Sequence, residues 1–194
     1  KAFHEKQVFK NCSFHIEDHE KAAIVGINGA GKTTLLRIIV GELEADSGQV
    51  VFGKDTSYGY LAQNAETDSE HTIYDELLEV KKDVILLEEK IRSCELEMRH
   101  VEGDALTALM EQYALYTHQF EQADGYSYKS EITGVLKGLG FTEEEFSKQA
   151  STLSGGQKTR VALGKLLLRK PDLIILDEPT NHLDMSSIAW LENY

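Results

Sequence analysis

Cysteine, proline and long apolar runs are all scarce in this sequence. Its 194 residues include two cysteines and two prolines beside 15 glycines. Cys12 and Cys94 lie far apart and match no metal-ligand spacing, which argues against a disulfide framework or a zinc finger and favours reduced thiols in a cytoplasmic protein. Because no stretch approaches the roughly 18 apolar residues that a transmembrane helix needs, we expect no membrane span.

Basic residues are also in short supply. Lysine and arginine number 20 against 33 aspartates and glutamates, which gives a net charge of −13 at pH 7 and a pI near 4.9. A surface of this sign repels DNA and RNA on average, so any contact with nucleic acid needs a local basic patch. Apolar residues, in contrast, make up 41% of the chain, which is enough for one globular domain with a sizeable core.

Short apolar runs near the two ends of the chain predict strands around a first helix. Residues 33–40 carry apolar side chains at helical spacing and stop at Gly41, which suits a C-cap. The run 173–176 suits a buried parallel strand. Strands at both ends with helical sequence between them indicate an α/β core interrupted by a helical insertion. The other predicted strands are 8–14, 22–25, 49–52 and 56–61.

Residues 73–122 show a heptad-like pattern. Apolar side chains alternate four and three positions apart over 73–101, and a similar spacing runs over 106–120. Gly103 and Asp104 between them supply a helix stop followed by an N-cap. Two antiparallel helices in a coiled-coil hairpin explain this pattern best, and a long globular helix with a kink is the alternative.

A glycine-rich segment fits the P-loop pattern G-x-x-x-x-G-K-[ST] in full, between a predicted strand and a predicted helix. Its glycines let successive backbone N–H groups point at one phosphate, and the helix that opens near Lys32 adds its positive end. Lys32 supplies a charge for the β- and γ-phosphates, and the Thr33 hydroxyl can coordinate Mg²⁺. The predicted ATP-binding residues here are Gly26, Ile27, Asn28, Gly29, Ala30, Gly31, Lys32, Thr33 and Thr34.

Two acids end the last apolar run. Asp177 and Glu178 directly follow 173–176. A strand that reaches the P-loop places Asp177 near the metal, a typical Walker-B role. Glu178 then leaves the strand and can polarise an attacking water as a general base. An acidic strand end alone is often ordinary surface, but a P-loop in the same chain favours the catalytic interpretation.

The segment Leu153-Ser154-Gly155-Gly156-Gln157 resembles the signature of the ABC ATPases. Ser154 caps a predicted helix whose N-terminal amides can face an anion, and the two glycines allow close approach. In the family, this end meets the γ-phosphate bound by the opposite domain. The resemblance therefore assigns Ser154, Gly155, Gly156 and Gln157 to the ATP of a partner domain.

Other segments agree with this resemblance, which covers essentially the whole chain. Gln63 stands where the family's Q-loop glutamine contacts metal and water, and residues 181–184 occupy the D-loop. Phe3 stands where these domains stack an aromatic ring on adenine, a match of position only, and such stacking leaves ATP and GTP undistinguished. The resemblance implies a Mg²⁺ site at Thr33, Gln63 and Asp177, with Glu178 and Gln63 as catalytic residues.

The implied fold is an α/β P-loop NTPase core of ABC type with a helical subdomain and an inserted antiparallel coiled-coil hairpin, or arm. The core is expected at 1–72 and 155–194, truncated at both ends, and the helical subdomain at 73–154 with the arm at about 73–122. The family's switch histidine follows a strand beyond the D-loop, outside these residues. We therefore expect a chain that binds MgATP but hydrolyses it weakly or not at all until a second ABC domain, in the same parent chain or in a homodimer, completes the site.

Two features indicate which group of the ABC ATPases the chain resembles. Gln63 and Leu153 are 90 positions apart, more than a plain transporter ATPase needs for its helical subdomain. Residues 177–184 read Asp-Glu-Pro-Thr-Asn-His-Leu-Asp, the form typical of the ABC-F group. The chain therefore resembles the N-terminal ATPase domain of a bacterial ABC-F protein, which implies a cytoplasmic factor acting on the ribosome in translation or antibiotic resistance. Basic residues near the predicted hairpin tip could contact RNA or ribosomal protein, or could form a solvated helix face. These residues are Lys90, Arg92, Arg99 and His100.

Three other functions stay open. The ATPase subunit of an ABC transporter would dock on a membrane subunit. A chromosome or DNA-repair ATPase also carries coiled coil between P-loop and signature, although generally a far longer one. An ATP-sensing module would bind nucleotide with negligible turnover, and the intact Glu178 argues against that function for the full protein.

Overall fold

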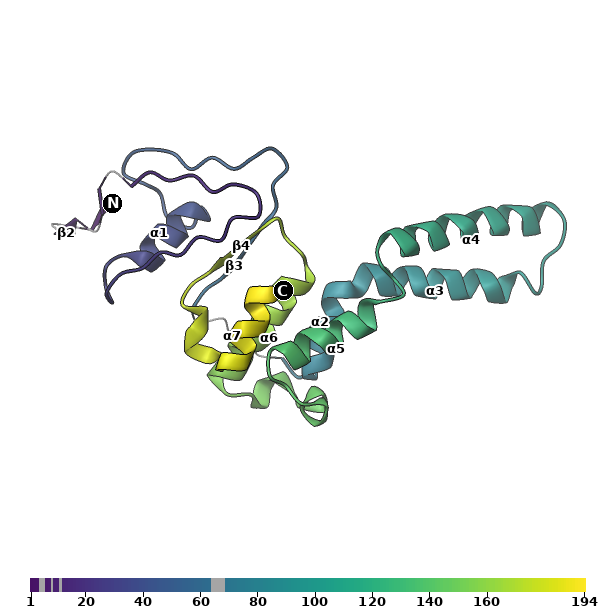
Figure 1. The fold of residues 1–194 in the computed structure, drawn as a ribbon. Helices are drawn as coiled ribbons and strands as arrows, with labels where there is room; N and C mark the ends of the chain where they lie inside the picture. Colours follow the sequence, from purple (N-terminus) through teal and green to yellow (C-terminus); the bar gives the residue numbers. More distant parts are fainter. Residues whose placement is uncertain (4–5, 8, 11, 64–68) are drawn as a thin grey trace. The chain divides into compact units, whose positions relative to one another are not determined.

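The computed structural model describes residues 1–3, 6–7, 9–10, 12–63 and 69–194. The chain divides into two compact units (Figure 1). Among the described residues, the first unit contains the β-strands and one α-helix, and the second contains the remaining α-helices. The first unit comprises Lys1–Gln63 and Pro171–Pro179, and the second comprises Asn64–Lys170 and Thr180–Tyr194.

A parallel strand pair forms the centre of the first unit. Strands β3 (Tyr58–Leu61) and β4 (Leu173–Leu176) pair along their whole length, from Tyr58 opposite Leu173 to Leu61 opposite Leu176. Leu61 and Ile175 are buried. The side chain of Asp172 extends the pairing by accepting hydrogen bonds from the backbone N–H and hydroxyl of Ser57, at 2.8 and 2.6 Å. The strand predicted at 173–176 and its parallel pairing are confirmed, but the predicted burial holds only for Ile175, and Ile174 is exposed.

Several predicted strands are wrong. No strand forms over 22–25 or 49–52, and Val25 is 91% exposed. The prediction at 8–14 falls partly outside the described residues, and its described positions 9, 10 and 12–14 are not strand. Apolar runs provide β-propensity, but a strand also needs a hydrogen-bonded neighbour. The ladders of the described residues join only β3 to β4 and, antiparallel, β1 (Ala2–Phe3) to β2 (Lys6–Gln7).

Helix α1 (Lys32–Ile39) follows the glycine-rich segment directly. Its N-cap residue is Gly31, which has a φ of 95°, and its C-cap residue is Val40, which is followed by Gly41 with a φ of 79°. Both glycines occupy the left-handed region, where a side chain is disfavoured and glycine is not. The predicted helix and its glycine C-cap are therefore confirmed to within one residue.

The second unit has a helical core. Helices α2 (Ile73–Leu78), α5 (Tyr128–Gly138) and α6 (Gly155–Leu168) pack together. Two 3₁₀ turns, η2 (Glu143–Ser147) and η3 (Ala150–Thr152), lead into α6. Helix α7 (Met185–Asn193) follows the short turn η4 (Pro179–His182) and packs on α5. Fully buried side chains of this core include Ile73, Leu77, Ile132, Val135, Leu136, Val161, Leu163 and Leu167.

Two longer helices lie side by side in the second unit (Figure 1). They are α3 (Lys82–Glu97) and α4 (Asp104–Gln122), joined by residues 98–103. The Lys90 ammonium lies 5.2 Å from the centre of the Tyr116 ring, which links the two helices by a cation–π contact.

The continuous first helix predicted from residue 73 is interrupted. Helix α2 ends at Leu78, and the 3₁₀ turn η1 (Glu79–Lys81) separates it from α3. The Lys81 ammonium pairs with Glu131 at 2.8 Å and donates to the Leu168 carbonyl at 3.2 Å. These tertiary anchors lie on α5 and at the end of α6, so the apolar spacing of 73–101 alone did not reveal the interruption. Among the helices of the described residues, none combines the length and apolarity needed to cross a bilayer.

Candidate functional site

The glycine-rich segment before α1 forms a tight loop. Gly29 and Gly31 have φ values of 78° and 95°. The Ala30 N–H donates to the Ile27 carbonyl at 3.1 Å. At Gly26, a Cβ atom would lie 3.3 Å from the Cβ of Ala30, closer than ordinary contact. The loop therefore needs glycine at 29 and 31 for backbone conformation, as the P-loop prediction requires.

Lys32 opens α1 and folds back over this loop. Its ammonium donates to the carbonyls of Gly26 at 2.9 Å and of Ile27 at 3.3 Å. The same nitrogen lies 3.4 Å from Glu178 Oε1. Thr33 and Thr34 follow in the first turn of α1 and are half-buried, whereas Ile27 and Asn28 are exposed. The Lys32 ammonium thus lies against two of the predicted phosphate-binding residues at the N-terminus of α1.

Asp177 lies directly after β4 and is buried, with 4% of its surface exposed. Its backbone N–H donates to the Leu61 carbonyl at 3.0 Å, which continues the strand pairing. Its Oδ2 atom has no hydrogen-bond partner within the described part of the chain. A carboxylate oxygen that is buried without a hydrogen-bond partner is costly. A divalent cation would supply the missing partner, so the residue fits the predicted metal site.

Glu178 contacts both Gln63, which follows β3, and Lys32, at the start of α1. Its Oε2 accepts a hydrogen bond from Gln63 Nε2 at 3.3 Å, and its Oε1 lies beside Lys32. Its φ of 51° places a glutamate in the left-handed region. Such a conformation costs roughly 1–3 kcal/mol and tends to occur at functional sites. The structure therefore brings Lys32, Gln63 and Glu178 together, residues far apart in the sequence.

Tyr60 is a neighbour of this cluster that sequence analysis missed. Burial raises the pKa of its hydroxyl, and the charges of Asp177 and Glu42 raise it further, while Arg37 opposes them. Tyr60 pairs with Ile175 in the strand ladder, two positions before Asp177. The strand register is the signal that places Tyr60 here, and only the observed pairing of β3 with β4 reveals it.

The signature residues lie in the second unit. The Ser154 hydroxyl accepts from the Gln157 backbone N–H at 3.3 Å, and Gln157 Oε1 accepts from the Ser154 backbone N–H at 3.1 Å. This pair of bonds is a capping box at the start of α6. Space remains open at Gly155, whereas a Cβ atom at Gly156 would lie 3.4 Å from Nδ1 of His182. Signature and D-loop are therefore neighbours within this unit.

Phe3 is the residue predicted to stack on adenine. It belongs to β1, and its side chain lies outside the described residues. The adenine contact predicted for it stays a prediction.

Residues 9–181 match the family described as ABC transporter. YdiF of Bacillus subtilis is 44% identical over the whole chain, which covers 30% of YdiF. The tylosin resistance ATP-binding protein TlrC of Streptomyces fradiae is 36% identical over the whole chain and 36% of its own length. The energy-dependent translational throttle protein EttA of Escherichia coli is 33% identical over 97% of the chain and 34% of its own length.

These relatives are ABC-F type ATP-binding proteins, and the chain spans about a third of the length of each. Solved structures agree on the fold. An ATP-binding subunit of an ABC transporter superposes with a TM-score of 0.64 at 20% identity, over 98% of this chain and 68% of that one. A complex of an archaeal ribosomal stalk protein with a ribosome recycling factor gives a TM-score of 0.57 at 26% identity, over 91% of this chain and 26% of that one.

Proposed function

Because the chain belongs to the ABC transporter family of ATP-binding domains, we propose that residues 26–34 bind the phosphates of MgATP. The support is the loop geometry before α1, where two left-handed glycines precede a helix N-terminus and Lys32 lies across the loop. The backbone amides and the helix end favour an anion. The Lys32 ammonium adds a full charge for the β- and γ-phosphates.

The donor set after β4 fits Mg²⁺. The buried Oδ2 of Asp177 offers an oxygen without another partner, and the Gln63 side chain lies beside Glu178 in the same unit. We assign Asp177, Gln63 and the Thr33 hydroxyl as the ligands. The cation, when bound with nucleotide, neutralises charge on the phosphate oxygens.

Glu178 is the proposed general base. Its carboxylate follows the metal residue by one position, is fixed by Gln63, and can accept a proton from an attacking water. It now faces the Lys32 ammonium. A bound γ-phosphate competes for that ammonium, and a carboxylate released from it is a better hydrogen-bond acceptor for water. Gln63 positions this carboxylate and is the second catalytic residue of the proposal.

Hydrolysis is proposed to need a second ABC domain, in the same parent chain or in a second copy. The capped N-terminus of α6 presents Ser154, Gly155 and Gly156, with open space at Gly155. We propose that this end completes the ATP site of a partner domain, with Gln157 holding the cap. The proposed domains are an ATP-binding core at 1–72 and 155–194 and a helical subdomain at 73–154, whereas the two compact units group α6 and α7 with the other helices of the second unit.

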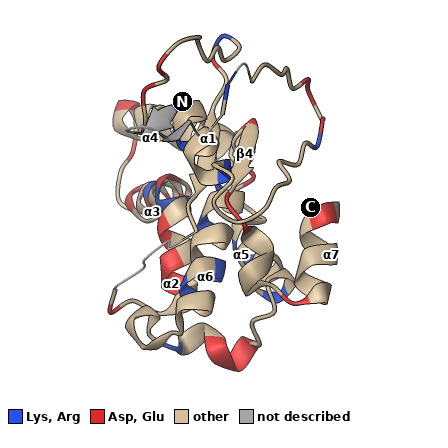
Figure 2. Cartoon of the chain, turned by 90° about the vertical axis from the view of Figure 1, so that its left-hand side faces the viewer, with Lys and Arg blue, Asp and Glu red and all other residues tan. Residues whose placement is uncertain are grey.

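The whole protein is proposed to be a cytoplasmic ABC-F factor that acts on the ribosome. Two relatives, a translational throttle protein and a tylosin resistance protein, support this proposal. The proposed arm, the inserted coiled-coil hairpin, is the segment at about 73–122, which includes α3 and α4. Figure 2 shows basic and acidic residues mixed along α3, and Arg92 pairs with Glu88 at 2.7 Å. Contact with RNA would therefore rest on local basic groups: Lys90, Arg92, Arg99 and His100.

The first experiment measures ATP affinity of this chain with Lys32→Ala. Loss of a charged hydrogen-bonding group is worth about 1.5–3 kcal/mol, so MgATP affinity should fall by about 10- to 100-fold. The matched control is Lys54→Ala, because Lys54 is an exposed lysine of the same unit. Equal MgATP affinity in both variants and the unchanged chain would remove residues 26–34 from the proposal.

The second experiment uses the full-length parent with Glu178→Gln and the equivalent change in its other ATPase domain. We expect ATP-dependent co-sedimentation with ribosomes, because slowed hydrolysis keeps the ATP-bound state populated. Binding of ATP without co-sedimentation would contradict the ribosomal role. Capture of a membrane subunit by the same variant would then support the transporter alternative.

A further inference from the structure

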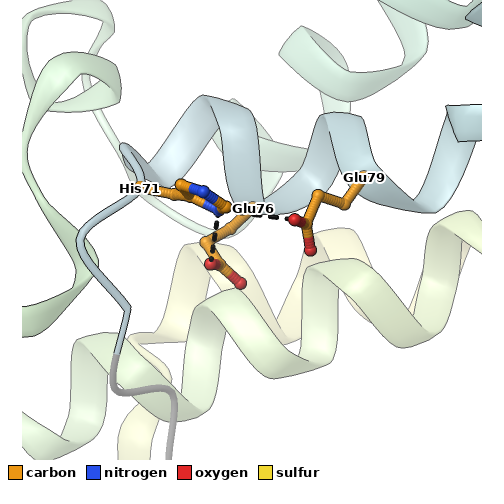
Figure 3. A group of neighbouring side chains, drawn as sticks. All are labelled: His71, Glu76 and Glu79. Atoms are coloured by element: carbon orange, nitrogen blue, oxygen red, sulfur yellow. Dashed lines mark ion pairs between the residues drawn. The ribbon is translucent and has the colours of Figure 1, made fainter.

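Three side chains of types that can ligate a metal ion converge at the start of the second unit (Figure 3). His71 precedes α2, Glu76 lies within α2, and Glu79 opens the turn η1. Nδ1 of His71 lies 3.4 Å from Glu79 Oε1 and 3.7 Å from Glu76 Oε1. One ligand atom from each residue lies within 4.8 Å of the other two. The site described above does not use any of the three.

The central carboxylate of this group is fixed in place. Glu76 is 3% exposed, and its Oε2 pairs with the Lys165 ammonium at 2.5 Å. Its second oxygen, Oε1, is the one that lies toward His71. Backbone contacts hold the histidine, because its carbonyl accepts from the Ala150 N–H at 2.9 Å. The Glu76 carboxylate and the backbone of His71 are therefore already held in place, which lowers the cost of binding a cation.

The separations are close to those of tetrahedral coordination. Zinc bonds of about 2.0–2.2 Å to nitrogen and oxygen place neighbouring tetrahedral ligands roughly 3.3–3.6 Å apart. The observed 3.4 Å lies within this range and 3.7 Å lies just above it, and the Glu76 and Glu79 ligand oxygens lie within 4.8 Å of each other. We propose that His71, Glu76 and Glu79 bind a zinc ion, with water as the fourth ligand.

The ligand types select the metal. Magnesium and calcium prefer six or more oxygen ligands, whereas one imidazole and two carboxylates suit zinc. The common non-haem iron site uses two histidines and one carboxylate, which is a different set. An ion can reach the site, because His71 and Glu79 also line a groove of about 580 Å³ between α2 and α3, with Leu78, Lys82 and Ile85. An imidazole that lies between two carboxylates without a metal ion would suit the same distances, and the experiment separates the two arrangements.

The test is titration of the nucleotide-free chain with zinc, followed by calorimetry. The test variants are His71→Ala and Glu79→Gln, because both side chains are 56% exposed and neither substitution opens the core. We expect one zinc ion per chain, with affinity at least tenfold weaker in each variant, since even second-sphere partners of a metal are worth about 10–100-fold. Magnesium titrated under the same conditions should bind this site far more weakly.

The matched controls are His118→Ala and Glu121→Gln, which change an exposed histidine and an exposed glutamate on α4. Both should bind zinc as the unchanged chain does. Zinc binding that is absent from the unchanged chain, or that persists equally in all four variants, would overturn the proposal. The result is independent of the ATP-site proposal, because no nucleotide is present.

Discussion

Replacing Lys165 by methionine should strongly destabilise the second unit. The Lys165 ammonium is the partner of the Glu76 carboxylate at 2.5 Å, and the carboxylate is 3% exposed. Burial by itself raises the pKa of Glu76, but hydrogen bonds from Lys165 and Ser69 outweigh it and leave the pKa below its usual value. The carboxylate is therefore ionised at pH 7. Without Lys165 it stays buried and loses its main counter-charge.

The expected cost is about 3 kcal/mol. Removing one partner of a buried ion pair costs roughly 3–5 kcal/mol, because the other charge is left uncompensated. The lower end applies because 23% of the Lys165 side chain is exposed, so water can replace part of the lost contact. With a urea dependence of about 1–3 kcal/mol per molar for a small domain, the unfolding midpoint should fall by roughly 1–3 M.

The assay is urea denaturation at pH 7 followed by tryptophan fluorescence, with EDTA present to exclude metal binding. Trp190 is the only tryptophan of the chain and lies on α7, so its signal reports the second unit. Adding Glu76→Gln to Lys165→Met should recover at least half of the loss, since the buried charge is then removed. Lys82→Met, at an exposed position, should change stability by less than about 0.5 kcal/mol. A loss below about 1 kcal/mol for Lys165→Met, the value of an exposed pair, would refute the reasoning.

Two further predictions concern the same unit and the same denaturation assay. A Cβ atom at Gly138 would overlap the Trp190 ring, whereas nothing lies within 4 Å of one at Gly134 on the same helix. Gly138→Ala should therefore destabilise by about 1–3 kcal/mol, and Gly134→Ala should stabilise by roughly 0.5–1 kcal/mol; the opposite order would contradict the packing. Burial raises the pKa of Glu131, but hydrogen bonds from Lys170 and Lys81 outweigh it and lower the pKa below 4.5. The contribution of Glu131 to stability is thus complete above pH 4.5 and is lost as pH falls through the folded-state pKa. Glu131→Gln should therefore flatten the pH dependence of the urea midpoint below about pH 4.5. An unchanged slope would contradict this prediction.

Local sequence signals predicted the parts of the site that depend on a few consecutive residues. The glycines around Lys32 and the capping box at Ser154 appear where their patterns place them. The strand at Leu173–Leu176 and the acids after it were also predictable. In each case the cause is local, either a backbone conformation that only glycine adopts readily or a hydrogen bond between residues three apart.

Local signals could not predict whether each apolar run finds a neighbouring strand to pair with. The runs 22–25 and 49–52 are apolar enough to form strands, yet in the described structure neither pairs with another strand. Pairing depends on which neighbour is present, and an apolar run does not contain that information. For the same reason, Tyr60 beside Asp177 and the interruption of the first long helix at η1 were not predicted.

The sequence by itself determined the family, the phosphate-binding loop and the helix cap of the signature, because each of these depends on residues that are close together in the sequence. Only the tertiary structure decided which distant charges meet. It placed Glu178 beside Gln63 and Lys32, buried Glu76 against Lys165, and left His71 facing the other oxygen of that glutamate. Such contacts depend on how helices and strands pack, since the energy of a charge is set by its burial and by partners that the chain brings from far away.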